Sequence, residues 1–290
     1  MRIGFLGFGE AARAFQDSLK AADPALRFSA WDILLLDEAG APAMRAAMQA
    51  GGVAETGPEG LCEADWVVSA VTADQSLLAL ESIAPHLVQG QLIIDINSVS
   101  PGRKRDSAAL TERARAHYLD MAVMAPVHPR GHRTPVLLAG GGIEVALGDL
   151  ERLGFDFREI GAEPGQATAI KMVRSLFVKG LEAVTVEALL AAKASGCFEE
   201  IVQSLSASYP GLGWPDFASY EFERTLRHGT RRAAEMRESA ATVSELGLNG
   251  ALAGEITEVQ ERMGGLGLAG GDTPLDELVA AVLNARLARN

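Results

Sequence analysis

A glycine-rich turn near the amino terminus holds the first residues whose types and spacing could do chemistry. Gly7, Gly9 and Ala12 form the pattern Gly-x-Gly-x-x-Ala between a predicted strand and a predicted helix. Gly7 permits a tight turn, Gly9 lets backbone approach a pyrophosphate, and Ala12 allows helix and strand to pack closely. Amide groups at such a helix start bind phosphate. The turn therefore predicts a dinucleotide site, and a turn without ligand is the alternative. The residues expected to bind the cofactor here are Gly7, Phe8, Gly9, Glu10, Ala11 and Ala12.

An acidic residue, Asp32, follows the second predicted strand, roughly 20 residues beyond the turn. Its carboxylate can accept hydrogen bonds from the adenosine ribose and would repel a 2′-phosphate, and no arginine follows closely. NAD is therefore favoured over NADP, which stays an alternative. Asp32 could instead cap the next turn, and Asp37 is a second candidate for the ribose contact. Val71 and Thr72 follow the third predicted strand, where contact with adenosine or ribose is expected.

The elements that position these residues alternate between short apolar runs and helical patterns. Strands are expected over Arg2–Leu6, Arg27–Trp31, Trp66–Val71, Leu92–Ile96, Tyr118–Val123, Val136–Ala139 and Phe157–Ile160. Helices are expected over Glu10–Ala22, Pro42–Ala50, Asp74–Ile83 and Pro101–Ala116. Runs that are apolar on both faces suit parallel strands covered by helices. The alternation predicts an α/β domain with a doubly wound, Rossmann-type sheet.

The pattern changes near residue 162. Apolar residues recur every three or four positions from Gln166 to Ala194, without proline, which predicts one long helix that stops before Gly196. The remainder predicts helices interrupted at Tyr209–Gly211, Gly247–Gly250 and Gly264–Gly271. We therefore expect a dinucleotide-binding domain over 1–162 and an all-α substrate or dimerisation domain over 163–290.

Composition excludes several classes of protein. The 290 residues carry 26 Lys and Arg against 38 Asp and Glu, a net charge of −12, which disfavours nucleic acid and anionic membranes as partners. No apolar run approaches the ~20 residues of a membrane span, and the amino terminus lacks the features of a signal peptide. Cys62 and Cys197 stand far apart and outside any zinc pattern. These features predict a reduced, cytoplasmic protein. The partner expected in place of nucleic acid or a membrane is a small-molecule substrate.

Four segments resemble, in order and spacing, those of the β-hydroxyacid dehydrogenase superfamily, which includes 3-hydroxyisobutyrate and 6-phosphogluconate dehydrogenases. They are the glycine turn, Asp95–Pro101, Tyr118–Val123 and Gly161–Lys171, and the similarity covers residues 1–195. The resemblance implies a nicotinamide-dependent oxidoreductase that transfers a hydride to or from the carbon of a hydroxy acid or related alcohol. It also implies a homodimer formed through the helical domain.

The resemblance implies that Lys171 is the catalytic lysine, which exchanges a proton with the substrate hydroxyl. Independently, Lys171 lies in the first turns of a mostly apolar helix, where a charge is costly unless it faces a polar site. The alternative is a lysine whose stem is buried and whose amine reaches solvent. The resemblance further places Asn97 and Ser98 against the substrate near the nicotinamide, with Asn97 also touching the cofactor.

The chain departs from the superfamily pattern at two places. Arg174 and Ser175 replace the expected Asn-Asn pair, although Ser175 lies one turn beyond Lys171 and could bond to it or to substrate. Met124, Ala125 and Pro126 replace the Ser-Gly-Gly that holds the substrate acid. Met124 would make that wall of the substrate site more apolar, which argues against a small hydroxy acid.

These departures resemble a branch that joins a 6-phosphogluconate-dehydrogenase-type domain to a distinct helical domain of uncertain substrate. Its most recognisable stretch is similar to Arg227–Met236, where His228, Arg231 and Arg232 could reach an anionic substrate or lie on a solvated helix face. His128 and His132 could line the pocket, and no metal site is expected.

Two other functions stay open. An imine reductase has the same two-domain layout but typically replaces the lysine with another proton donor, so Lys171 favours alcohol chemistry. A dinucleotide-binding sensor without catalysis would keep the glycine turn and Asp32 and would need no lysine.

Overall fold

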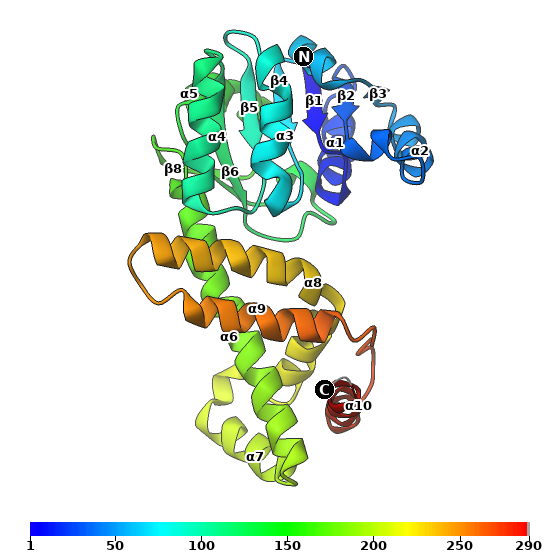
Figure 1. Ribbon diagram of the computed structural model, residues 1–290, viewed down its shortest axis with the longest axis vertical. Coiled ribbons are helices and arrows are strands. Elements are labelled where there is room, and N and C mark those ends of the chain that lie inside the picture. Colours follow the sequence, from blue (N-terminus) through cyan, green and yellow to red (C-terminus); the bar gives the residue numbers. More distant parts are fainter. Residues whose placement is uncertain (289–290) are drawn as a thin grey trace. The chain divides into compact units, whose positions relative to one another are not determined.

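The computed structural model describes residues 1–288 and divides into two compact units (Figure 1). The first unit is Met1–Met172 and the second begins at Val173. The expected boundary at residue 162 falls earlier, because the first turns of helix α6 (Gln166–Ala194) are hydrogen-bonded to the sheet and stay with the first unit. Among residues 1–288, no helix has both the length and the apolar character that a membrane span requires.

One sheet organises the first unit. Within the described residues it has eight strands in the order β3-β2-β1-β4-β5-β6-β7-β8, parallel throughout except for the β6–β7 pair. The strands are β1 (Arg2–Leu6), β2 (Arg27–Trp31), β3 (Ala54–Glu55), β4 (Trp66–Ser69), β5 (Leu92–Asp95), β6 (His117–Val123), β7 (Val136–Ala139) and β8 (Phe157–Gly161). No α-helix crosses over between β6 and β7, which are joined by a loop with one short 3₁₀ turn (Gly131–Arg133), and these two strands run antiparallel. The doubly wound α/β fold is confirmed, and its order reverses between β1 and β4.

Helices cover both faces of this sheet. They are α1 (Glu10–Ala22), α2 (Ala41–Gly51), α3 (Ser76–Ile83), α4 (Pro101–Arg113) and α5 (Gly142–Leu153). Side chains of a strand alternate between faces, so Phe5 packs in one core with Phe15 of α1 and Leu150 of α5. Leu6 points the other way and packs in the core that contains Leu80 of α3 and residues of α4.

Helix α5 was not expected from the sequence. It begins at Gly142 and contains Gly148, and glycine disfavours a helix interior by about 1 kcal/mol relative to alanine. Burial of Ile143, Ala146 and Leu150 against the sheet outweighs that preference. Strand β3 was also missed, since two residues carry no periodicity.

The second unit is all-α, as expected. From Val173 it contains the rest of α6, then α7 (Phe198–Ser208), α8 (Asp216–Glu245), α9 (Ala251–Gly264) and α10 (Leu275–Leu287). The breaks fall at the predicted proline and glycine clusters. Helices α8 and α9 cross where Gly229 meets Gly264, and a Cβ on Gly229 would lie 2.6 Å from the Gly264 nitrogen. Glycine at both positions therefore allows this close crossing.

A buried polar cluster lies inside the second unit. Arg232 of α8 pairs with Glu182 of α6, and the Gln260 side chain donates to the same carboxylate at 2.9 Å. Glu221 is 6% exposed, and its Oε2 has no hydrogen-bond partner among the described residues. Burial, reinforced by the Glu182 charge, raises the pKa of Glu221 to about 7, although Arg232 and Arg224 oppose that rise. Glu221 is thus a buried carboxyl that prefers its proton.

Stability of this unit should therefore fall as pH rises. The unfolded chain releases the Glu221 proton near its ordinary value of 4.5 and the folded chain near 7, so between these values the folded state binds the extra proton. The stabilisation that the protonated Glu221 contributes below pH 4.5 decreases by about 1.4 kcal/mol per pH unit between pH 4.5 and 7. We expect Glu221→Gln to match wild type at about pH 4 and to exceed it by about 3 kcal/mol at about pH 8 in urea unfolding. Glu223→Gln, on the same helix and paired with Arg227, is the control. An E221Q effect independent of pH would contradict this account.

Candidate active site

The glycine turn joins β1 to α1 at the reversal point of the sheet. Gly7 has φ +84°, and a Cβ there would lie 2.7 Å from the Ala70 carbonyl oxygen, so only glycine fits. Gly9 has extended backbone, and no described atom outside its chain neighbours lies within 4 Å of a Cβ built on it. Ala12 is fully buried against the sheet. The turn thus has open space at Gly9, above the start of α1, where a phosphate-bearing group fits.

Asp32 lies beside this turn with 8% of its surface exposed. Its carboxylate accepts from the Phe8 amide at 2.7 Å and from the Leu34 amide at 2.9 Å, which caps the short helix Ile33–Leu36. The capping alternative is therefore present in the structure. Each carboxylate oxygen keeps a second lone pair, so a ribose contact is compatible with it. Asp37 caps the next turn by accepting from Gly40 at 2.9 Å.

The turns that follow β4 and β5 are held together by Asn97. Its Oδ1 accepts from the Val71 amide at 2.7 Å, and its Nδ2 donates to Ser69 at 2.8 Å and to Ser76 at 3.3 Å. Asn97 is 4% exposed, and both ends of its amide have partners within the protein. The structure places Asn97 beneath the predicted site, where it fixes the backbone of Val71.

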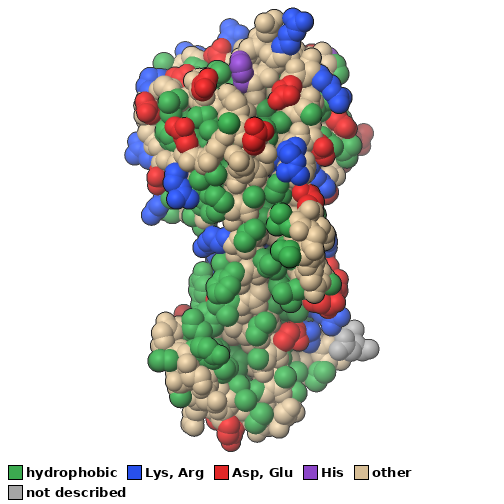
Figure 2. All heavy atoms as spheres, turned by 90° about the vertical axis from the view of Figure 1, so that its left-hand side faces the viewer, with side chains coloured by type: hydrophobic (Ala, Val, Ile, Leu, Met, Phe, Trp, Pro, Cys, Tyr) green, Lys and Arg blue, Asp and Glu red, His purple; other side chains and the backbone are tan. Residues whose placement is uncertain are grey.

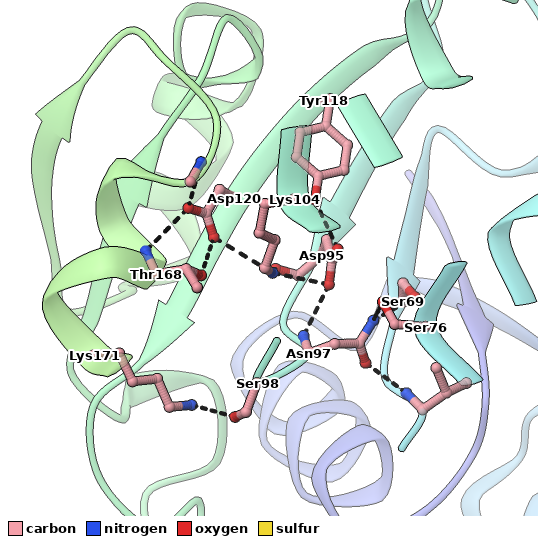
Figure 3. Close-up of polar contacts among 12 residues, drawn as sticks. Ser69, Ser76, Asp95, Asn97, Ser98, Lys104, Tyr118, Asp120, Thr168 and Lys171 are labelled. Atoms are coloured by element: carbon pink, nitrogen blue, oxygen red, sulfur yellow. Dashed lines mark hydrogen bonds and ion pairs between the residues drawn. The ribbon is translucent and has the colours of Figure 1, made fainter. Parts of the chain in front are cut away.

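Lys171 lies opposite Ser98 in the first unit (Figure 3). The Lys171 Nζ donates to the Ser98 Oγ at 2.6 Å, and Lys171 is partly buried. One chain of close approaches and hydrogen bonds therefore links the glycine turn to the lysine, through Gly7, Val71, Asn97, Ser98 and Lys171. The structure brings these predicted site residues together at the carboxyl ends of β1, β4 and β5.

Three buried charges behind this site were missed in the sequence. Asp95 of β5 and Asp120 of β6 are register partners, and Lys104 of α4 lies between them. The Lys104 Nζ is 2.9 Å from Asp95 Oδ1 and 3.4 Å from Asp120 Oδ1, and it also donates to the Asp95 carbonyl at 2.7 Å. Burial and the two carboxylates raise the pKa of Tyr118 well above its ordinary value, and its hydroxyl donates to Asp95 at 2.7 Å. Charged residues inside apolar strands were the available signal.

Met124 packs near the turn of α6 that precedes Lys171, and Ser175 follows Lys171 on the same helix. Met124 packs against a small core that includes Ala167, one helical turn before Lys171. Ser175 is buried and lies one turn after Lys171. The Met124 side chain, expected to form an apolar wall, thus packs against a cluster that includes the turn of α6 before Lys171.

The predicted histidines have different surroundings. His132 is buried, with Nδ1 2.8 Å from Ser18 Oγ and Nε2 2.9 Å from the Leu153 carbonyl, so its ring joins α1 to α5. His228 belongs to the second unit, where burial, and then neighbouring arginines such as Arg224, lower its pKa. Arg232 forms an ion pair with Glu182, so its guanidinium is already bound within the protein. Within residues 1–288, no group of His, Cys, Asp and Glu side chains suits a metal.

Comparison with known proteins places the chain in a family. Residues 192–263 match a family described as a domain of unknown function, DUF1932. A conserved hypothetical protein from Sinorhizobium meliloti 1021 is 33% identical, with a TM-score of 0.77 over 100% of this chain and 97% of that one. Conserved protein MTH1747, titled as structurally similar to 3-hydroxyacid dehydrogenases, is 28% identical, with a TM-score of 0.71 over 91% of this chain and 96% of that one. A Mycobacterium tuberculosis 3-hydroxyisobutyrate dehydrogenase is 17% identical, with a TM-score of 0.71 over 97% and 98%, which shows the fold alone.

Fold and comparisons together define a protein with a Rossmann-type unit followed by an all-α unit. The chain belongs to the β-hydroxyacid dehydrogenase superfamily, and the resemblance drawn from its four sequence segments is confirmed.

Proposed function

We propose that the protein is an NAD-dependent oxidoreductase that transfers a hydride between a substrate hydroxyl carbon and the nicotinamide ring. The observation that carries this proposal is the Lys171–Ser98 hydrogen bond, in which Nζ lies 2.6 Å from Oγ. It lies at the carboxyl ends of the strands, where the glycine turn also lies. The open space at Gly9 and the amides at the start of α1 suit the pyrophosphate of a dinucleotide. When bound, the nicotinamide supplies the hydride acceptor or donor.

Lys171 and Ser98 would handle the proton of this reaction. As the hydride leaves the carbon, the C–O bond becomes a carbonyl and the hydroxyl proton must go to a base. The neutral Lys171 amine takes that proton and becomes an ammonium ion, and in reduction it returns the proton to the carbonyl oxygen. Ser98 orients the amine through its hydroxyl and can contact the same substrate oxygen.

The proposed substrate is a hydroxy acid or a related alcohol. Met124, Ala125 and Pro126 stand where the superfamily places a polar acid-binding Ser-Gly-Gly, so an apolar group beside the reacting carbon fits better than a second charge. The test is NADH formation from NAD⁺ with a panel of hydroxy acids and alcohols of graded apolar size. If NADH does not bind and no compound in either direction is turned over, the proposal is wrong.

Two other functions remain testable on the same scaffold. An imine reductase would reduce cyclic imines and tolerate loss of Lys171, because such enzymes typically use another proton donor. A sensor would bind NADH without turnover. Retention of Lys171 beside Ser98 favours the dehydrogenase.

The NAD preference is assigned to Asp32. We expect Asp32→Asn to raise the affinity for NADPH relative to NADH about tenfold, since the variant removes a negative charge from the position of a 2′-phosphate. The apolar segment Ile33–Leu36 that follows offers no cation to replace it. Fluorescence titration with both nucleotides measures the ratio. Asp37→Asn removes the charge of the second candidate, which also caps a turn, and it should leave the ratio unchanged if Asp32 makes the ribose contact. Wild-type protein that prefers NADPH would contradict the role of Asp32.

Pairing of two copies through the helical unit is the assembly we propose. Val173, Phe177 and Val184 are 52%, 72% and 66% exposed and repeat at helical spacing along one face of α6. Figure 2 shows hydrophobic side chains gathered over this unit. An exposed apolar face of this kind is typical of a protein interface.

Cys62 and Cys197 are free thiols, which suits the reducing cytoplasm that we propose as the location.

A further inference from the structure

Three fully enclosed charges connect α4 to the centre of the sheet (Figure 3). We call Asp95, Lys104 and Asp120 the buried charge triad. Their exposed fractions are 2%, 0% and 0%. The two carboxylates are register partners on neighbouring strands, and Lys104 is the cation that both of them contact.

Such a triad is costly to bury, and its geometry offsets that cost. The ammonium group of Lys104 has three hydrogens and meets three acceptors, which are Asp95 Oδ1, the Asp95 carbonyl and Asp120 Oδ1. Without the cation, two carboxylates would face one another away from water. Apolar residues of similar volume could fill this space at less cost, so the charges call for a role other than packing.

Each carboxylate of the triad holds one half of the candidate site. Asp120 Oδ2 accepts from the amides of Gly165 at 3.1 Å and Thr168 at 3.0 Å, and its Oδ1 accepts from the Thr168 hydroxyl at 2.7 Å. It therefore caps the start of α6, one turn before Lys171. Asp95 Oδ1 accepts from the Asn97 amide at 2.9 Å, next to Ser98.

Lys104 joins these two halves. The Lys171–Ser98 hydrogen bond spans 73 residues of sequence, and the turn after β5 and the start of α6 must keep their separation for it to form. We propose that Lys104 is a positioning residue that fixes the Lys171 amine opposite Ser98 by tying Asp95 to Asp120. Its effect on turnover rests on the proposed function, whereas its effect on the Lys171 amine does not.

The test compares Lys104→Met with Gln91→Met in the full chain. Gln91 lies at the opposite end of β5, is 4% exposed, and donates to the carbonyls of Leu61 and Ala64, both at 2.8 Å. Both variants lose buried hydrogen bonds in the same unit. The readout is the acetylation rate of Lys171, one of five lysines in the chain, followed by mass spectrometry. A second readout is kcat against the KM for NAD.

We expect Lys171 in the Lys104→Met protein to be acetylated several times faster than in wild type, and kcat to fall about 10- to 100-fold with little change in KM. Gln91→Met should lower stability and leave both readouts near wild type. Equal acetylation of Lys171 in wild type and Lys104→Met would overturn the positioning role. Faster acetylation in a protein whose wild type turns over nothing would support the triad and reject the dehydrogenase.

A second, milder variant keeps the proposal testable if Lys104→Met does not fold. Thr168→Val keeps the shape of the side chain and removes only the 2.7 Å hydrogen bond to Asp120. It should raise the acetylation rate of Lys171 by a smaller factor than Lys104→Met. If Lys104→Met does not fold and Thr168→Val leaves that rate unchanged, the proposal fails.

Discussion

Replacing Lys171 with methionine should lower kcat by about 10²- to 10⁴-fold while NADH binds as in wild type. Methionine keeps the length and the apolar stem of the side chain but has no amine to exchange a proton with the substrate oxygen. The glycine turn and Asp32, which are expected to bind the cofactor, lie on other elements and are unchanged. Steady-state rates and an NADH fluorescence titration measure the two quantities separately.

Lys193→Met is the matched control for this variant. Lys193 lies on the same helix and is 3.6 Å from Asp276 in a partly exposed ion pair, which is worth little. Its loss should leave kcat and NADH affinity unchanged. A Lys171→Met enzyme as fast as wild type would show that another group carries the proton, as in an imine reductase. A wild-type protein that binds NADH and turns over nothing would instead support the sensor.

Elements governed by local chemistry could be predicted from the sequence. The helix Gln166–Ala194 has the bounds that its apolar period and glycine stop indicated, and α1 begins directly after the glycine turn. Helix α5 could not be predicted, because its glycines oppose a helix locally and only packing on the sheet stabilises it. Its existence depends on contacts between residues far apart in sequence.

Some residues of the candidate site could likewise be identified from the sequence, and others could not. Gly7 and Gly9 were identifiable because the backbone conformation and the open space they provide are local properties. Lys171 and Ser98 came from resemblance, and the structure places them in contact. The capping of α6 by Asp120 spans 45 residues to Gly165, and no local pattern indicates which helix a strand carboxylate will cap. Asn97 was assigned to ligand, whereas its amide groups bond within the protein.

Substituting Gly9 with valine should weaken NADH binding by about 10- to 100-fold without unfolding the protein. Gly9 has φ −79° and ψ −162°, an extended conformation that valine adopts readily. No described atom beyond its chain neighbours lies within 4 Å of the added Cβ, so the folded chain has room for it. That room is where the pyrophosphate should approach the backbone, and a hydrogen bond to a charged group is worth about 1.5–3 kcal/mol.

The neighbouring glycine provides the contrast that makes this result interpretable. Gly7→Ala places a side chain at φ +84° and 2.7 Å from the Ala70 carbonyl oxygen, so the free energy of unfolding should fall by about 2 kcal/mol or more. Thermal unfolding and NADH titration should therefore distinguish the two variants. Gly7→Ala loses stability, and Gly9→Val loses binding at wild-type stability. If Gly9→Val binds NADH as wild type does, the space above α1 is not the pyrophosphate site. The glycine turn would then be a structural feature alone, and the cofactor assignment would lose the geometry on which it depends.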